Sequence, residues 1–111
     1  MQRVLTNTER EALARFKGAL VPLLGDNLVS VRLFGSRARG EGTSDSDLDV
    51  LIVLRRKDAA TCRVIVEAAL DVDLAYGTNV APTILTKQEY DRNRDCGTPF
   101  YRNVEQDAVA L

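Results

Sequence analysis

The segment Asp47–Leu54, read as DLDVLIVL, constrains the fold more than any other part of the chain, because it predicts a β-strand with two aspartates at its start. Successive side chains of a strand point to opposite faces of a sheet. Asp47 and Asp49 therefore share one face with Leu51 and Val53. The other face carries Leu48, Val50, Ile52 and Leu54. The Cα atoms of the two aspartates then lie about 7 Å apart.

Two carboxylates on one face of a strand need a compensating partner. Aspartate is depleted in strands, and neighbouring anions repel each other, so the arrangement costs stability unless a cation or water lies between them. Mg²⁺ prefers carboxylate oxygens, water and substrate phosphates as ligands. Asp47 and Asp49 are therefore candidate magnesium ligands. Asp45, which precedes the strand where aspartate commonly closes a turn, is left out of the metal set.

A second strand is predicted over Asn27–Phe34, immediately before the segment GSRARG. Gly35 ends this strand, and we expect Ser36 to be the N-cap of a short helix that Gly40 ends. A helix N-terminus presents unpaired N–H groups and partial positive charge, which favour a phosphate. Gly35 lacks the Cβ that would keep a phosphate away, and Ser36 adds a hydroxyl donor.

Two arginines, Arg37 and Arg39, lie within the turn and are expected to contact a triphosphate, since guanidinium groups suit bidentate phosphate contacts. The segment has neither the Gly-Lys-Ser/Thr ending of a P-loop nor the GxGxxG spacing of a dinucleotide-binding fold. Those two classes of nucleotide site are excluded.

The remaining chain alternates between helical and extended patterns. Thr8–Leu24 is predicted as a helix with a capping box formed by Thr8 and Glu11. The other expected elements are a helix over Asp58–Leu70 capped by Asp58, a strand around Val72–Tyr76, an edge strand over Pro82–Leu85, and helices over Lys87–Asn93 and Phe100–Ala110. Asp95–Pro99 is predicted as a loop. The expected fold class is α+β, with a mixed sheet flanked by helices.

Composition narrows the function. The chain has 111 residues, which predicts a single domain over 1–111. Its net charge of −1 argues against a general nucleic-acid binder. The absence of histidine excludes Ser-His and Cys-His mechanisms and a histidine zinc site, and the two cysteines are too few for a disulfide framework. The polar N-terminal segment predicts neither a signal peptide nor a membrane span, so we expect a cytoplasmic protein.

The pattern of Gly35-Ser36, ten further residues and then Asp47-Leu48-Asp49 resembles the signature of the polymerase-beta-like nucleotidyltransferase superfamily. The chain looks like its minimal, single-domain members, and the likeness extends through Pro99–Arg102. The resemblance implies that fold, an activity that transfers a nucleotide from ATP or another nucleoside triphosphate, and two Mg²⁺ ions.

The resemblance also implies a third carboxylate on a neighbouring strand, at the position of Asp73. Asp71 and Asp73 would share one face of the strand expected there, so spacing alone does not choose between them. Asp73 lies inside the apolar run, where an unpaired charge is costly, and is favoured for that reason. The hypothesis makes activity depend on Asp47, Asp49 and Asp73 meeting opposite the Gly35-Ser36 turn.

Members of this kind often act as antitoxins beside a helical HEPN ribonuclease and transfer AMP to a tyrosine of that toxin, whereas others modify small molecules such as aminoglycosides. The resemblance therefore implies protein AMPylation in a toxin–antitoxin pair, with a HEPN-domain partner. The alternative is a non-catalytic module that blocks a partner through an exposed apolar patch of Phe100, Tyr101 and Val104. Oligomeric state stays open, and a homo-oligomer is one possibility.

Overall fold

The computed structural model describes residues 5–41 and 47–111; Asp45 and its neighbours over 42–46 lie outside the described residues. A four-stranded mixed sheet has the order β3-β2-β1-β4. β1 (Leu28–Phe34) pairs antiparallel with β2 (Leu48–Leu54) and with the short β4 (Val109–Ala110), while β3 (Val80–Thr86) pairs parallel with β2. The expected α+β class with a mixed sheet is confirmed.

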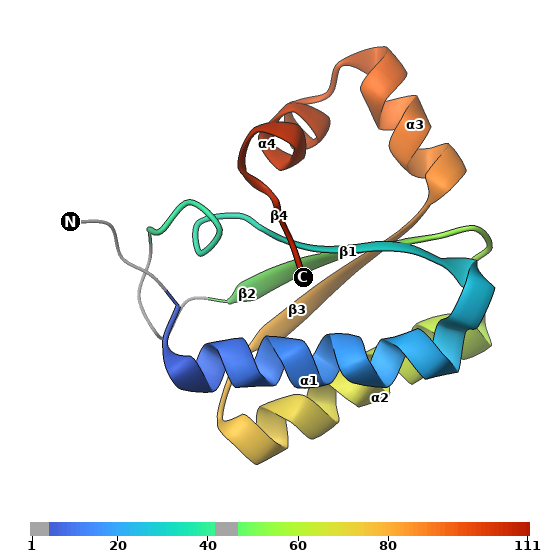
Figure 1. Cartoon of the computed structure of the whole chain (residues 1–111). Helices are drawn as coiled ribbons and strands as arrows, with labels where there is room; N and C mark the ends of the chain where they lie inside the picture. Colours follow the sequence, from blue (N-terminus) through green and yellow to red (C-terminus); the bar gives the residue numbers. More distant parts are fainter. Residues whose placement is uncertain (1–4, 42–46) are drawn as a thin grey trace.

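Two helices, α1 (Asn7–Leu24) and α2 (Ala59–Tyr76), cover one face of the sheet, and α3 (Lys87–Cys96) and α4 (Pro99–Asp107) lie on the other side (Figure 1). The main core lies under α1 and α2. It contains the β2 residues Leu48, Val50, Ile52 and Leu54. A smaller cluster under α4 contains Leu51, Val53 and Val104. The predicted alternation along β2 is therefore confirmed, and Asp49 belongs to the α4 side.

The N-cap of helix α1 lies two residues earlier than expected. Thr6, not Thr8, is its N-cap, and Glu9, not Glu11, completes the capping box. The two pairs have the same spacing, so the sequence pattern did not distinguish them. Glu9 is selected because its carboxylate is also bound from another element, as described below. An apolar stripe of Leu13, Phe16 and Leu20 along this helix is buried.

Helix α2 is capped by Asp58 as predicted, but it continues six residues beyond the expected end at Leu70. Consequently there is no strand around Val72–Tyr76. Residues Ile65, Ala68, Ala69 and Val72 form a buried stripe at helical spacing, and Gly77 in the left-handed conformation ends the helix. The stripe and the glycine were the sequence signals for the longer helix. The β-branched Val64–Val66 segment is accommodated because the stripe packs against the sheet.

The C-terminal region differs in two places. Residues Asp95 and Cys96 are the last of α3 and not a loop, and α4 begins at Pro99 behind the N-cap Thr98. The helix expected to run to Ala110 ends at Asp107, because Val109 and Ala110 add a fourth strand to the edge of β1. In the described part of the chain, every helix is too short or too polar to cross a membrane.

Candidate active site

The site is built where β1 ends and β2 begins. Asp47 is exposed directly before β2, and Asp49 is partly buried on its second position. Asp49 lies opposite Phe34, the last residue of β1, in the antiparallel register. The intervening Leu48 points into the main core. Both carboxylates are therefore held at one end of the sheet by a strand whose other side chains are buried.

Gly35 follows β1 and is in close contact with Asp49. Its φ is +78°, a conformation that side-chain-bearing residues rarely adopt. A Cβ built on Gly35 would lie 2.4 Å from Oδ2 of Asp49. The glycine was predicted to make room for a phosphate. In the structure it already makes room for the carboxylate of Asp49, so the turn and the acidic pair form one site.

The chain after Gly35 forms a series of turns, not the short helix that was expected. The carbonyl of Gly35 accepts hydrogen bonds from the N–H groups of Ala38 and Arg39, at 3.2 and 3.3 Å. The prediction of Ser36 as the N-cap of a short helix is therefore wrong, and the Gly35 carbonyl accepts the first hydrogen bonds of the turns. Glu41 N–H donates to the Ser36 carbonyl at 2.8 Å, and Gly40 with φ +76° closes the turn, as predicted.

The electrostatics of the site favour a cation. Partial burial raises the pKa of Asp49 above its ordinary value, and the negative charge of Asp47 raises this pKa further. A cation close to both carboxylates would offset the effect of burial and the repulsion between the two charges. Oxygen ligands of this kind suit Mg²⁺, so Asp47 and Asp49 are suited to hold a divalent cation.

The two arginines of the turn have different environments. The guanidinium of Arg37 is buried and bound to Glu9 through two nitrogens, at 2.7 and 2.6 Å. Its prediction as a direct triphosphate contact is therefore wrong for the side chain. Arg39 is exposed, with Nε 3.1 Å from Glu41 and Nη1 3.6 Å from Asp107. Arg39 can exchange these carboxylates for a phosphate.

The third carboxylate is not where the sequence hypothesis placed it. Asp73 lies in the last turn of α2, and its Oδ1 accepts hydrogen bonds from Thr78 Oγ1 and Val80 N–H, both at 2.9 Å. Asp71 lines a cavity of about 390 Å³ between α1 and α2. Helix α2 packs on the face of the sheet opposite the Asp49 face. The structure therefore places neither aspartate on the sheet face that carries Asp49, although Asp73 binds the start of β3, which pairs with the start of β2.

Strand β3 does not supply a substitute. In the parallel register Asp49 lies beside Ala81 and Leu51 beside Thr83, and β3 reads VAPTILT. A carboxylate beside Asp49 would have to stand at the position of Ala81. Among the residues that the structure describes, no three Asp, Glu, Cys or His side chains form a group able to hold a metal ion. The acidic set of the described site has two members.

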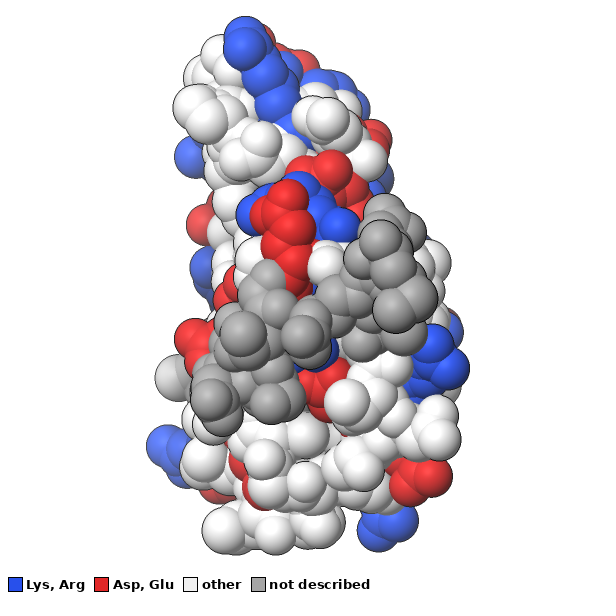
Figure 2. All heavy atoms as spheres, turned by 90° about the vertical axis from the view of Figure 1, so that its left-hand side faces the viewer, with Lys and Arg blue, Asp and Glu red and all other residues white. Residues whose placement is uncertain are grey.

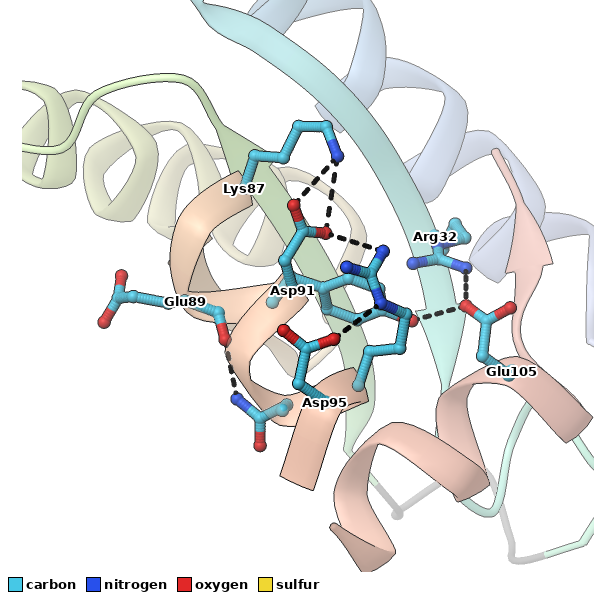
Figure 3. Close-up of polar contacts among 9 residues, drawn as sticks. Arg32, Lys87, Glu89, Asp91, Asp95 and Glu105 are labelled. Atoms are coloured by element: carbon cyan, nitrogen blue, oxygen red, sulfur yellow. Dashed lines mark hydrogen bonds and ion pairs between the residues drawn. The ribbon is translucent and has the colours of Figure 1, made fainter. Parts of the chain in front are cut away.

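A separate ionic network ties α3 and α4 to β1 (Figure 3). Arg32 of β1 donates to Glu105 of α4 at 3.2 Å, its guanidinium lies 5.2 Å from the ring centre of Tyr90, and Tyr90 also donates to Glu105. Lys87 and Arg94 both approach Asp91 along α3. The contacts of Arg32 with Tyr90 and Glu105 hold α3 and α4 against β1, and none of the network's members was predicted.

The prediction of an exposed apolar patch on the last helix, through which the chain would block a partner, is wrong. Val104 is fully buried, and Phe100 packs edge-on against Phe34 with ring centres 5.6 Å apart. Tyr101 is partly buried against Tyr90. The apolar side of α4 therefore belongs to the protein's own core.

The surface around the site has both signs of charge. Figure 2 looks onto the end of the molecule where β1 ends, and basic and acidic side chains are interspersed across it. Such a surface suits a charged small substrate bound at one point better than the backbone of a nucleic acid, which favours a continuous basic face.

Comparison with known sequences gives a consistent result. The model of a family described as "Nucleotidyltransferase domain" matches residues 13–105. A Methanocaldococcus jannaschii protein named "Putative protein adenylyltransferase" is 30% identical over 79% of this chain, which spans 59% of that protein. A second M. jannaschii protein of the same name is 27% identical over 93% of this chain and 97% of its own length.

Solved structures agree on the fold. The "Structure of putative minimal nucleotidyltransferase" superposes with a TM-score of 0.57 and 26% identity, covering 92% of this chain and 94% of that one. A mutant of the toxin-antitoxin MntA-HpeT gives a TM-score of 0.56 at 20% identity, covering 96% of this chain and 72% of that one. The predicted nucleotidyltransferase fold is thereby confirmed.

Proposed function

The chain belongs to the nucleotidyltransferase domain family, and on that premise we propose that it transfers AMP from ATP to a hydroxyl of a protein. The observation that carries this proposal is the contact of Gly35 with Asp49, which joins a phosphate-binding turn to an acidic pair at one end of the sheet. A turn that acts together with the carboxylates accounts for this close approach of the Gly35 backbone to Asp49.

The acidic pair and the turn have different roles in the proposed reaction. Asp47 and Asp49 hold a divalent cation, which we propose to be Mg²⁺; when bound, it neutralises charge on the triphosphate. The hydroxyl of Ser36 and the backbone of the Gly35 turn donate to the phosphate oxygens, and Arg39 adds a positive charge at the rim. These groups fix the α-phosphorus beside Asp49.

In the transfer itself, the acceptor oxygen forms a bond to the α-phosphorus, and the bond from that phosphorus to the bridging oxygen of pyrophosphate breaks. The acceptor proton passes to solvent or to a carboxylate, since the chain has no histidine. The resemblance implied two Mg²⁺ ions and a third carboxylate at Asp73. With two carboxylates among the described residues, we propose one ion held by this chain.

We propose a tyrosine of a HEPN-type toxin as the acceptor, and hence an antitoxin role in the cytoplasm. The relatives named as protein adenylyltransferases support a protein acceptor, and the fold likeness to MntA-HpeT is compatible with a toxin partner. The loss of the apolar patch on α4 removes the surface on which the alternative of a simple blocking module relied.

The decisive experiment incubates co-purified chain and partner with ATP labelled on its α-phosphate and magnesium. Labelled partner, with the mass increase of AMP, is expected for the wild type. Asp47→Asn and Asp49→Asn are expected to lower the rate at least about a hundredfold because each removes a cation ligand.

Asp91→Asn is the matched control, since Asp91 lies in the ion pairs of α3 away from the turn. It removes one carboxylate and is expected to transfer at the wild-type rate. Undiminished transfer by Asp49→Asn would overturn the proposed role of the acidic pair.

A further inference from the structure

A buried ion pair links the phosphate-binding turn to the first turn of α1. The side chain of Arg37 is 2% exposed and that of Glu9 is 7% exposed. Nη1 of Arg37 donates to one carboxylate oxygen of Glu9 and Nη2 to the other. This two-point contact fixes both the distance and the angle between the groups, which a single contact would not do.

Glu9 is itself held by the N-terminus of α1. Its Oε1 accepts the Thr6 N–H at 2.8 Å, and its own N–H donates to Thr6 Oγ1 at 3.1 Å. The same oxygen also accepts Nη2 of Arg37. The carboxylate therefore has a fixed position on the end of a helix that is buried against the main core.

Arg37 lies in the turn between Gly35 and Gly40, two positions with positive φ that give the backbone alternatives. Anchoring the side chain of Arg37 restricts the two residues directly before it, Gly35 and Ser36, and with them the Gly35 carbonyl that accepts from Ala38 and Arg39. The position of Gly35 in turn affects Asp49. The two residues are in such close contact that the Gly35 backbone cannot move toward Asp49 Oδ2 without displacing it.

Stability alone is a poor reason for such a pair. Burying two charges costs desolvation energy that apolar side chains of similar size would avoid, and replacing a buried pair by apolar residues is often neutral or stabilising. The pair supplies instead a fixed geometry for the turn.

We propose that Glu9 is a positioning residue for the phosphate-binding turn, acting through Arg37. The proposal rests on the proposed function for its consequence, since the turn is what binds the triphosphate. Glu9 does not contact the substrate; it keeps Gly35, Ser36 and Asp49 in the arrangement that receives it before the nucleotide arrives.

The chain contains its own control for this proposal. Helix α3 begins with a second capping box, formed by Thr86 and Glu89, with nearly the same distances of 2.9 and 3.0 Å. Glu89 also pairs with a basic residue, Lys57, but through a single nitrogen at 2.9 Å and with both side chains about a third exposed. Figure 3 shows Glu89 on α3, with its side chain directed away from Arg32 of β1.

The test compares Glu9→Gln with Glu89→Gln. Glutamine still accepts the N-cap N–H in a capping box, so both variants keep their helix caps. Both lose one negative charge. Only Glu9→Gln also loses the second acceptor for Arg37, because the amide group of glutamine offers one oxygen. A difference between the variants therefore reports the link to the turn and not the cap.

The first readout is hydrogen exchange of the Ala38, Arg39 and Glu41 amides in nucleotide-free protein. Glu9→Gln is expected to raise these exchange rates about tenfold, and Glu89→Gln to leave them unchanged. The second readout is the steady-state kinetics of AMP transfer in the presence of magnesium. Glu9→Gln is expected to raise the KM for ATP about tenfold with a smaller change in kcat, since the phosphates of bound ATP themselves hold the turn in place.

Equal exchange rates in the two variants and the wild type would overturn the positioning role. If Glu9→Gln does not fold, Arg37→Lys replaces it, because lysine keeps the charge but cannot make the two-point contact. It is expected to show the same rise in exchange and KM. Wild-type protein that transfers no AMP would contradict the proposed function, whereas an active wild type with an equally active and equally protected Glu9→Gln contradicts only the inference made here.

Discussion

Two corners of the molecule each combine a glycine in the left-handed conformation with a nearby aspartate, and the sequence hypothesis gave both aspartates the same role. At the end of β1, Gly35 has φ +78° and touches the carboxylate of Asp49. At the end of α2, Gly77 has φ +68°, and its N–H donates to the Asp73 carbonyl at 2.8 Å.

The difference lies in what binds each carboxylate. Asp73 accepts hydrogen bonds from Thr78 and from the first residue of β3, so its negative charge is used to connect a helix to a strand. Asp49 is instead partly buried beside another aspartate, and its pKa is raised by this burial and, second, by the charge of Asp47. A carboxylate bound by N–H and O–H donors is part of the fold, while one placed beside another carboxylate needs a ligand from outside.

The largest expected effect comes from the two glycines. Gly35→Ala and Gly77→Ala both place a side chain at positive φ, which costs about 1 kcal/mol. A Cβ at Gly77 meets no atom within 4 Å, whereas one at Gly35 would lie 2.4 Å from Asp49 Oδ2. Gly35→Ala is therefore expected to displace Asp49 and abolish binding of ATP with magnesium, measured by calorimetric titration.

Gly77→Ala is the control for that measurement, since it carries the same backbone strain. It is expected to lower the melting temperature by several degrees and to bind ATP as the wild type does. Equal loss of binding in the two variants would mean that the two corners are not distinct.

The sequence predicted one of these corners and not the other, for a physical reason. Asp47 and Asp49 lie directly before and within β2, where period-2 alternation fixes the face of each side chain, and Gly35 directly follows β1. Asp73 lies in the segment Val72–Tyr76, whose alternating apolar and polar residues fit a strand as well as a helix. Packing of Ala69 and Val72 against the sheet decides for the helix.

The link between Glu9 and Arg37 could not have been derived from local patterns. The two residues are 28 positions apart, and each has an ordinary local role, one in a capping box and the other in a turn. Their pairing follows from α1 packing beside the end of β1. Contacts of this kind depend on tertiary structure, which is why Arg37 was predicted at the phosphate instead.

The next effect in size concerns Asp73. Asp73→Ala leaves the Val80 N–H and the Thr78 hydroxyl without their acceptor, and both hydrogen bonds are partly buried, so the loss costs about 1–2 kcal/mol. The free energy of unfolding in urea is expected to fall by that amount, while transfer of AMP by the folded fraction stays within about twofold of the wild type.

A fall in transfer comparable to that of Asp49→Asn, at concentrations of urea where Asp73→Ala is folded, would return Asp73 to the active site. Asp71→Ala serves as the control. It removes an aspartate from the same helix, two residues before Asp73, and Asp71 lines the cavity between α1 and α2.

The smallest effect is a change in stability of the nucleotide-free protein with pH. Because burial and Asp47 raise the pKa of Asp49 above the ordinary value of 3.8, the folded protein binds a proton more tightly at this site than the unfolded chain does. The contribution of Asp49 to stability therefore falls as pH rises from 3.8 through the folded pKa, and the full penalty is present at neutral pH.

Asp49→Asn removes this penalty and is expected to raise the melting temperature by a few degrees at neutral pH in the presence of a chelator. The gain should vanish below pH 3.8, where the carboxyl is protonated in both states. Calorimetry of both proteins across this range checks the sign, and a variant less stable than the wild type at neutral pH would show that Asp49, like Asp73, is bound by donors of its own fold.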